Sequence, residues 1–378
     1  MMKSIIRQLS FIPKPHQNPN HHQSSLFSSL TKRTNQTPPL TNQTQFNQKL
    51  SQLVPRFTPT DLYNLINKQH DPLLCLHLFN WASKQNRYTH NVSTYHIIIK
   101  KLGAAKMYDQ MDLIVNEVLS FSCFGNEHLY NTVVYFYTEF RKLSKAVCVY
   151  KHMRNVGKLN SECRPSIRTY NLLFTAFLSR RSNSYINHVY MDTMSMLFKQ
   201  MVNDGIEPDI FALNCMIKGY VISLHVNDAL RLYHQMGVVY DVRPNSFTFD
   251  YLIHGLCAQG RTCNAGKICG EMKLKGFVPS SKSYNSLVSA FALEGEVDKA
   301  VGYLWEMVES ERVGDYITYW TLIDECCGCK RIGDAMSLLE ELQEKRVVDR
   351  HTYMKLRHEV EVKYGNLCRR NSPKSQSQ

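Results

Sequence analysis

Apolar side chains recur along residues 92–349 at the spacing of amphipathic helices. Within residues 281–315, the first predicted helix places apolar residues at i, i+3, i+4 and i+7, which are Tyr284, Leu287, Val288 and Phe291. Gly295 interrupts this pattern, and residues 297–307 then repeat the same apolar spacing. The segment is therefore expected to form two helices joined by a short turn.

This helical hairpin recurs about every 35 residues. An aromatic residue or leucine begins the apolar face of each first helix, at Tyr95, Tyr130, Tyr170, Leu213, Phe249, Tyr284, Tyr319 and Tyr353. An alanine keeps the same period in the second helix, at Ala229, Ala265, Ala300 and Ala335. Because a hairpin this short cannot bury both of its faces alone, consecutive hairpins must stack on each other. The sequence therefore predicts an all-α fold, a right-handed α-solenoid.

The domain boundaries are predicted from the period. Seven repeats are expected at residues 92–126, 127–166, 167–209, 210–245, 246–280, 281–315 and 316–349. Residues 57–91 predict a degenerate helix pair that caps the first repeat, and residues 350–365 predict a C-terminal capping helix. A disordered tail is expected over residues 366–378. The third repeat is longer than the others, and its additional residues are expected in the turn at 181–190.

The first 56 residues differ in composition from the rest. Residues 1–60 contain no Asp or Glu, seven of the thirteen prolines, and seven of the 45 Lys and Arg residues. Residues 1–11 predict a short amphipathic helix that carries Lys3 and Arg7. An acid-free, hydroxyl-rich segment of this kind is typical of an organellar transit peptide, and the helix favours the mitochondrion over the chloroplast. A disordered basic tail is the alternative interpretation.

Several classes of protein are disfavoured by the sequence. No apolar run approaches the 18 residues of a membrane span, so membrane insertion is not expected. The twelve cysteines show neither zinc nor disulfide spacing, and most are expected to be buried as small apolar residues. Residues 260–267 resemble a phosphate-binding loop, but Ile268 stands where a metal-binding Ser or Thr is needed. We therefore expect no catalytic residues, metal, cofactor or small-molecule substrate, and a protein that is not an enzyme.

Two segments carry a family resemblance most clearly. SYNSLVSAFALEGEVDKAVGYLWEMVESERVGD (Ser283–Asp315) and TFDYLIHGLCAQGRTCNAGKICGEMKLKGFVPS (Thr248–Ser280) show an aromatic–polar helix start, a Gly turn, and an Ala and a Met in the second helix. These features resemble the pentatricopeptide repeat, of P type, of plant organelle RNA-binding proteins. The resemblance covers about residues 92–365. The Trp/Gly/Tyr signature of the tetratricopeptide repeat, the main alternative, is absent.

The resemblance implies a row of base-reading residues. In this family, the residue after the aromatic and the last residue of the repeat form a reading pair. The implied pairs are Asn131/Ser166, Asn171/Asp209, Asn214/Asn245 and Asn285/Asp315, together with His96/Asn126, Asp250/Ser280 and Trp320/Asp349. The family's code then implies a target of 5′-N-C-U-Y-N-U-N-3′. His96, Asp250 and Trp320 depart from the common set, so no base is implied for their repeats.

A second interpretation of the reading asparagines is structural. Each asparagine near a helix start is also a candidate N-cap for a free backbone N–H group. Basic residues on or near the first helices are candidate phosphate contacts, namely Lys100, Lys101, Arg168, Lys218 and Lys282. For each of these, a solvated surface position is the alternative. The net charge of +13 falls to about +6 outside the N-terminal segment, so the basic balance of the repeats is mild.

Two functions from different classes follow. The favoured hypothesis is sequence-selective binding of single-stranded organellar RNA, for RNA processing, stability or translation. The alternative is a protein-interaction scaffold, for example a peripheral subunit of the organellar ribosome, in which contacts with other organellar proteins dominate. The irregular reading pairs and the mild charge favour this second hypothesis.

Overall fold

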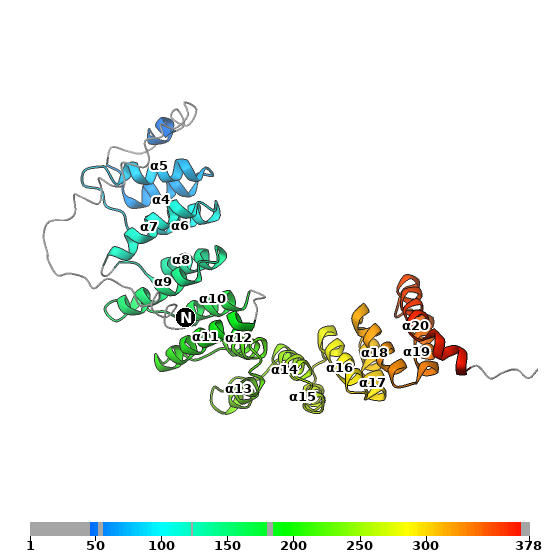
Figure 1. Ribbon diagram of the computed structural model, residues 1–378. Coiled ribbons are helices and arrows are strands. Elements are labelled where there is room, and N and C mark those ends of the chain that lie inside the picture. The colour runs from blue at the N-terminus through cyan, green and yellow to red at the C-terminus, as the bar shows by residue number, and fades with distance from the viewer. Residues whose placement is uncertain (1–45, 52–55, 122–123, 180–183, 372–378) are drawn as a thin grey trace, which may run out of the picture. The chain divides into compact units, whose positions relative to one another are not determined.

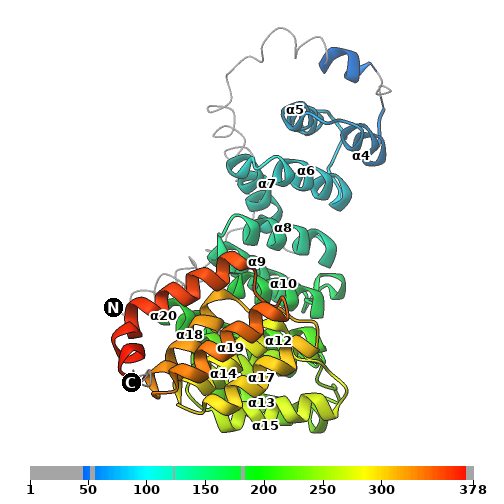
Figure 2. The ribbon, with the colours of Figure 1, turned by 90° about the vertical axis from the view of Figure 1, so that its right-hand side faces the viewer.

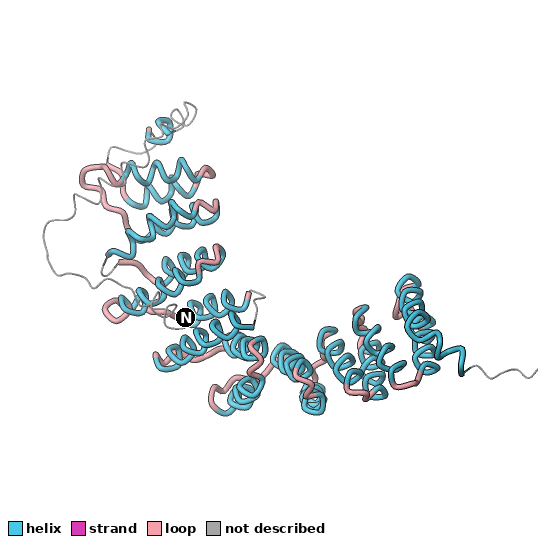
Figure 3. Tube along the Cα trace, viewed as in Figure 1, coloured by secondary structure: helices cyan, strands magenta, loops and turns pink. Residues whose placement is uncertain are grey.

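The computed structural model describes residues 46–51, 56–121, 124–179 and 184–371. These residues form helices joined by short connections, and none of the described residues is in a strand (Figure 3). The chain divides into two compact units, residues 1–176 and 177–378, which are described separately below.

The first unit is built from successive helix pairs (Figure 1). Its elements are α4 (Pro59–Asn67), α5 (Pro72–Ala82), α6 (Val92–Ala104), α7 (Tyr108–Ser120), α8 (Glu127–Glu139), α9 (Leu143–Val156), the 3-10 turn η1 (Ser161–Cys163) and most of α10 (Ile167–Leu178). The first helices α4, α6 and α8 pack on each other in that order, and α7 and α9 each pack on their own first helix.

The second unit continues the same pattern. Its elements are α11 (Ser184–Asn203), α12 (Ile210–Ile222), α13 (Val226–Val238), α14 (Ser246–Ala258), α15 (Thr262–Leu274), α16 (Ser281–Leu293), α17 (Val297–Glu309), α18 (Tyr316–Gly328), α19 (Ile332–Glu344) and α20 (Arg350–Asn371). The helices α12, α14, α16, α18 and α20 form a continuous row of first helices. Figure 2 shows the long α20 beside α18 and α19, on which it packs.

The residues that define the period form the core. The aromatic or leucine residue of every first helix is buried, and the second-helix alanines Ala229, Ala265, Ala300 and Ala335 are fully buried. Small side chains there allow the paired helices to approach closely, and the stacked pairs then bury what a single hairpin would expose. The prediction of an all-α solenoid is confirmed.

The turn between the two helices of a repeat needs one residue with a left-handed backbone. Glycine fills this position at Gly260 and Gly295, whose φ angles are 66° and 78°. Leu224 and Lys330 fill the equivalent position with φ angles of 64° and 62°. A residue with a Cβ atom is strained in this region, so these turns are held by the packing of the flanking helices.

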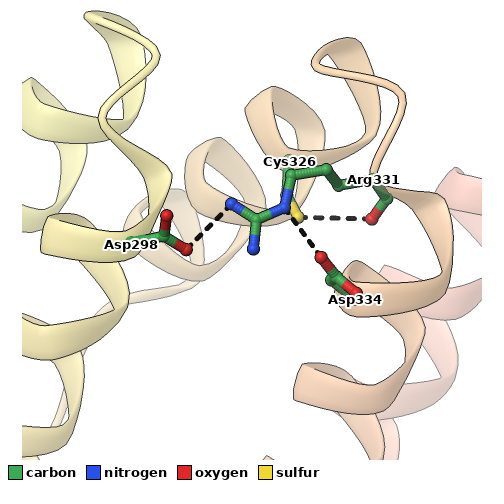
Figure 4. A network of polar contacts seen from close by, with 4 residues as sticks. All are labelled: Asp298, Cys326, Arg331 and Asp334. Atoms are coloured by element: carbon green, nitrogen blue, oxygen red, sulfur yellow. Dashed lines mark hydrogen bonds and ion pairs between the residues drawn. The ribbon is translucent and has the colours of Figure 1, made fainter.

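Successive second helices are linked by polar contacts at the start of each helix. Figure 4 shows Arg331, which precedes α19, forming ion pairs with Asp298 of α17 (2.8 Å) and with Asp334 (2.7 Å). Its carbonyl accepts a hydrogen bond from Cys326 Sγ of α18 (3.4 Å). Arg261, which precedes α15, makes the equivalent link two repeats earlier by donating to Asn227 Oδ1 of α13 (2.7 Å). These contacts help to fix the step from one repeat to the next.

The structure corrects several sequence-based boundaries. The additional residues of the third repeat lengthen α11 to 20 residues instead of extending a turn, because no helix-breaking residue lies between Ser184 and Asn203. The C-terminal helix continues to Asn371, beyond the predicted end at residue 365. Residues 46–50, which lie within the predicted transit peptide, are helical and place Phe46 and Leu50 at the i, i+4 spacing. The predicted helix at residues 1–11 and most of the predicted transit peptide lie outside the described residues.

The cysteine prediction is partly correct. Cys75, Cys163, Cys215, Cys269, Cys326 and Cys327 are buried. Cys148, Cys263 and Cys329 are exposed instead, because they lie on the outer faces or at the ends of their helices. Among the described residues, no group of three or more His, Cys, Asp or Glu side chains is arranged to hold a metal ion.

Candidate nucleic-acid interface

The two members of each predicted reading pair have different structural roles. The last residue of a repeat is the N-cap of the next first helix: Asn126 Oδ1 accepts from the backbone N–H of Leu129, and Asp209 Oδ1 accepts from that of Ala212. Asn245, Ser280, Asp315 and Asp349 cap their helices in the same way. The first member of a pair lies in the first helix of its own repeat, about one turn after that helix begins. The interpretation of Asn131, Asn214 and Asn285 as N-caps is therefore wrong, because the last residues of the preceding repeats cap their helices: Asn126, Asp209 and Ser280.

In the second repeat, Asn131 is enclosed by polar groups and only 5% exposed. Its Oδ1 accepts a hydrogen bond from Thr169 Oγ1 of α10 (2.7 Å), and its Nδ2 donates to Glu127 Oε1 (2.9 Å). Ser166, the predicted partner of Asn131, donates to the same carboxylate oxygen. Glu127 therefore joins the two members of this pair, and it is a site residue that was not predicted from the sequence.

In the fourth repeat, the pair is in direct contact. Asn214 Nδ2 donates to Asn245 Oδ1 (3.0 Å), and Asn214 Oδ1 accepts from Thr248 Oγ1 of α14 (2.7 Å). Asp250 is placed similarly in the fifth repeat, where its Oδ1 accepts from Ser283 Oγ (2.6 Å) and from the backbone N–H of Ser280 (3.2 Å). Both sites therefore bring the predicted pair together at the junction of two first helices.

The two remaining regular pairs differ from these. Asn285 lies at the equivalent place on α16, but its buried Oδ1 accepts no hydrogen bond in the part of the chain that the structure describes. Asn171 is half-buried on α10, and Asp209 caps α12 in the other compact unit. This last pair therefore stays a prediction from the sequence.

The two outermost repeats depart most from the regular pattern. His96 Nε2 lies 2.9 Å from Thr132 Oγ1, and its ring lies 4.4 Å from that of His128. Burial, with the neighbouring His128 and Lys100, lowers the pKa of His96 to about 4, so this ring is neutral at pH 7. At the other end, Lys363 of α20 lies over the ring of Trp320 (5.8 Å). His96 and Trp320 therefore lack the side-chain amide that contacts the next first helix at Asn131 and Asn214.

A further set of residues shares one position in the repeats, and its apolar members are not among the predicted site residues. The residue three positions before each predicted reader is the second residue of its helix, and several of these are exposed apolar side chains: Phe211 (48% exposed), Phe247 (61%) and Ile317 (70%). Arg168 and Lys282 occupy the same position in their repeats and are also exposed. Large apolar groups exposed at one repeated position indicate a binding surface. Comparison of the repeats at this position would have revealed the set.

Basic residues accompany the reading positions in the first unit. Lys100 and Arg168 line a hollow of about 220 Å³ together with His96, His128 and Asn131. The hollow thus brings two predicted readers and two predicted phosphate contacts onto one surface, which runs across three consecutive first helices. In the second unit, Lys282 is exposed and Lys218 lies over the ring of Tyr251 (5.8 Å).

Lys101 differs from the other predicted phosphate contacts in its surroundings. Its ammonium group donates to the backbone carbonyls of Asn67 (3.0 Å), the last residue of α4, and of Gln69 (2.5 Å), two residues later. It therefore satisfies carbonyls that the end of the helix leaves without intrahelical partners. This contact places the half-buried Lys101 at the junction of α4 and α6, with its ammonium group engaged by the backbone.

Comparisons with known proteins bear on this arrangement. The model of the PPR repeat family matches residues 208–258 and 244–293, and that of the PPR repeat matches residues 282–311 and 317–347. A mitochondrial pentatricopeptide repeat-containing protein of Arabidopsis thaliana is 61% identical over 241 residues, covering 64% of this chain and 54% of that protein. A second mitochondrial protein of this kind, also from Arabidopsis thaliana, is 32% identical over 197 residues, covering 52% of this chain and 51% of that protein. The chain contains pentatricopeptide repeats over residues 208–311 and 317–347.

Solved pentatricopeptide repeat structures share its fold. The crystal structure of the pentatricopeptide repeat protein PPR10 from maize matches with a TM-score of 0.53 and 18% identity, over 88% of this chain and 50% of that chain. PPR10 in complex with an 18-nucleotide psaJ RNA element matches with a TM-score of 0.54 and 18% identity, over 87% and 44%. The present chain spans about half the length of the curated relatives that it matches. In this chain, no helix of the described residues combines the length and apolar character needed to cross a membrane.

Proposed function

We propose that this protein binds single-stranded RNA along the row of first helices and recognises bases through the paired positions. The observation that carries the proposal is the recurrence of one arrangement in separate repeats. A polar reader on one first helix meets the N-cap region of the next, as Asn131, Asn214 and Asp250 do. A constant step between such sites suits a ligand that is itself a chain of regularly spaced units.

Chemistry beside the readers supports a nucleic acid as that ligand. Exposed Phe211 and Phe247 offer flat apolar faces on which bases can stack, and Arg168, Lys282 and Lys100 offer charge for phosphates. Amide, carboxylate and hydroxyl groups at the reading positions distinguish donor from acceptor edges of a base. PPR10, whose fold is similar, has been crystallised with an RNA element, and this supports the same class of ligand.

We propose that the protein acts in the mitochondrion and without catalysis of its own. The acid-free N-terminal segment and the two mitochondrial relatives support this location. The repeats are of P type in this proposal, because five of the seven have 34–36 residues and they share the same sequence features. Bound RNA would be shielded from nucleases or prevented from pairing with itself, which suits a role in RNA processing, stability or translation.

Selection of the purified protein against a random RNA pool tests this function. Enrichment of a short pyrimidine-rich single strand, with affinity that falls as salt rises, is the expected result. An Asn171→Thr variant should then change the preferred base facing the third repeat away from U and leave the other positions unchanged. If no sequence is enriched, or if the variant enriches the same sequence, base reading through these positions is wrong.

A protein scaffold is the second candidate. The amides of Asn131 and Asn214 are engaged in hydrogen bonds within the protein, and Lys363 and Tyr364 contact Asp324 at the end of the row of first helices. Both features favour a surface with fewer groups open to RNA. Co-sedimentation with mitochondrial ribosomes that persists after RNase treatment, without binding to naked RNA, would decide for the scaffold.

A further inference from the structure

In two separate repeats, a hydroxyl group from the next first helix contacts the reading asparagine. Thr248 Oγ1 lies 2.7 Å from Asn214 Oδ1, and Thr169 Oγ1 lies 2.7 Å from Asn131 Oδ1. Both threonines are the third residue of their helix, next to the buried aromatic residue, and both are fully buried. Neither is a member of a reading pair. Resting on the proposed RNA binding, we propose that Thr169 and Thr248 are positioning residues that determine base preference, by fixing which atom of the preceding reader faces the RNA.

The direction of the hydroxyl hydrogen follows from the backbone. The backbone N–H of Asn245 donates to Thr248 Oγ1 (3.1 Å), as part of the capping box that begins α14. A backbone N–H can only donate, so Thr248 Oγ1 accepts there and its single hydrogen is left to donate elsewhere. Its shortest contact is Asn214 Oδ1. The same chain runs from the backbone N–H of Ser166 to Thr169 Oγ1 (3.3 Å) and on to Asn131 Oδ1.

This chain fixes the orientation of the reading amide. Thr248 Oγ1 lies closer to Asn214 Oδ1 (2.7 Å) than to its other acceptor, Asn245 Oδ1 (3.2 Å), so its hydrogen is directed at the Asn214 oxygen and favours the amide orientation that places the oxygen there. The Nδ2 group is then directed the other way, where one of its hydrogens bonds to Asn245 Oδ1 (3.0 Å). Asn245 Oδ1 also accepts from the backbone N–H of Thr248 (3.2 Å), so its own amide is oriented as well.

The fixed orientation determines what a base meets. Asn245 Oδ1 accepts two hydrogen bonds within the protein and Asn214 Oδ1 is directed at Thr248, so the N–H donors are the groups of this pair with the most capacity left for a base. A site of donors selects acceptor groups, and the O2 carbonyl is an acceptor that cytosine and uracil share. Without Thr248, the Asn214 amide could turn over and present an oxygen, which would favour a base with a donor at that edge.

Other repeats of this chain provide internal controls. Ser283 Oγ makes the equivalent contact with Asp250, but a carboxylate has two equivalent oxygens and no orientation to fix. Asn285 has the amide without the contact, because its Oδ1 accepts no hydrogen bond although Thr318 occupies the third position of α18. Removal of the hydroxyl of Thr248 or Thr169 should therefore alter the base preference of the repeat that contains Asn214 or Asn131. Removal of the hydroxyl of Ser283 or Thr318 should leave the base preference at Asp250 or Asn285 unchanged.

The test uses the full chain and RNAs that differ only at the base facing the fourth repeat in the selected sequence. In wild-type protein we expect pyrimidines to bind about tenfold better than purines there, a typical discrimination for one well-placed base contact. In Thr248→Val, which removes the hydroxyl at almost constant volume, this ratio should fall below about threefold. Thr248→Ser, which keeps the hydroxyl, should retain it. Thr318→Val should leave the preference at the sixth repeat unchanged.

The outcomes separate this inference from the proposed function. A wild-type protein that binds no RNA, or binds without sequence preference, overturns the proposed function and this inference with it. A selective wild-type protein whose Thr248→Val variant keeps the full ratio overturns the inference alone. Thr169→Val repeats the measurement for the second repeat in the other compact unit, so the test does not depend on the folding of one variant. A general loss of structure would lower the melting temperature of a variant and reduce its affinity for all RNAs equally. A loss of base preference alone would leave the melting temperature unchanged.

Discussion

Lys145 Nζ lies 2.5 Å from Asp112 Oδ2, and this ion pair joins the second helices α7 and α9 of two successive repeats. Tyr137 of α8 also donates to Asp112 Oδ1 (2.7 Å), so one carboxylate connects three helices. Burial favours a higher pKa for Asp112, but the hydrogen bonds from Lys145 and Tyr137 and the charge of Lys145 hold its pKa below the ordinary value of 3.8.

The first prediction concerns this pair. Lys145→Met, which keeps most of the aliphatic chain, should lower the free energy of unfolding of the first unit by about 1 kcal/mol at pH 7, the upper end for a partly exposed pair. Because the folded-state pKa is depressed, the stabilisation is present above pH 3.8 and is lost as the pH falls below it. Urea denaturation of both proteins at pH 7 and pH 3 checks this. A difference of equal size at the two pH values would contradict the assignment to charge.

The second prediction concerns base stacking. Phe247→Ala should weaken RNA binding by about 1–3 kcal/mol, the typical loss of one aromatic stacking platform. Phe247 is 61% exposed, so the melting temperature should change little. Leu274→Ala is the matched control, since Leu274 is a large apolar residue at the end of the second helix α15 and is 90% exposed. Equal affinities of the two variants in fluorescence anisotropy would show that Phe247 does not contact RNA.

The third prediction separates two basic residues that the sequence does not distinguish. Arg168→Gln should reduce the slope of log affinity against log salt by about 0.7, the value for one phosphate contact on a single strand. Lys101→Gln should leave this slope unchanged and lower the melting temperature, because the carbonyls of Asn67 and Gln69 lose their donor. If Lys101→Gln alters the salt slope as much as Arg168→Gln does, the role assigned to Lys101 is wrong.

The fourth prediction concerns the turns within the repeats. Leu224→Gly should stabilise the second unit by up to about 1 kcal/mol, because glycine adopts the left-handed backbone of this position without strain. Gly295→Ala should destabilise it by about 1–2 kcal/mol, although no atom stands within 4 Å of the added Cβ. Opposite shifts in thermal melts are expected. Shifts of the same sign would show that contacts, rather than backbone strain, control these turns.

The fold could be predicted from the sequence because its determining features are local and repeated. The buried aromatics, the second-helix alanines and the glycines of two turns all lie at fixed offsets, so each repeat confirmed the interpretation of the others. The turns at Leu224 and Lys330 were less visible, because the residue there carries no conformational signal of its own. The lengths of α11 and α20 were not predicted either, because their additional residues lie outside the repeated pattern of about 35 residues and have no counterpart in the other repeats.

The candidate site was predictable in position but not in its contacts. The offsets placed Asn214 and Asn245 in one site, and the structure brings them within hydrogen-bond distance. The part played by Thr248 depends on the step between two helices, which a single repeat does not encode. Lys101 is a similar case, because it and Lys100 are adjacent in the sequence and only the packing of α4 on α6 distinguishes them.

The N-cap role of the second reading residue has a consequence for how such arrays change over generations. Asn126, Asp209, Asn245, Ser280, Asp315 and Asp349 each begin a helix, and the side chains that do this well are few: Asn, Asp, Ser and Thr. These are also side chains that differ in the donors and acceptors they offer to a base. Exchange within this small set would therefore alter the recognised nucleotide while the helix keeps its start, so that mutation can explore new target sequences without first losing the folded protein.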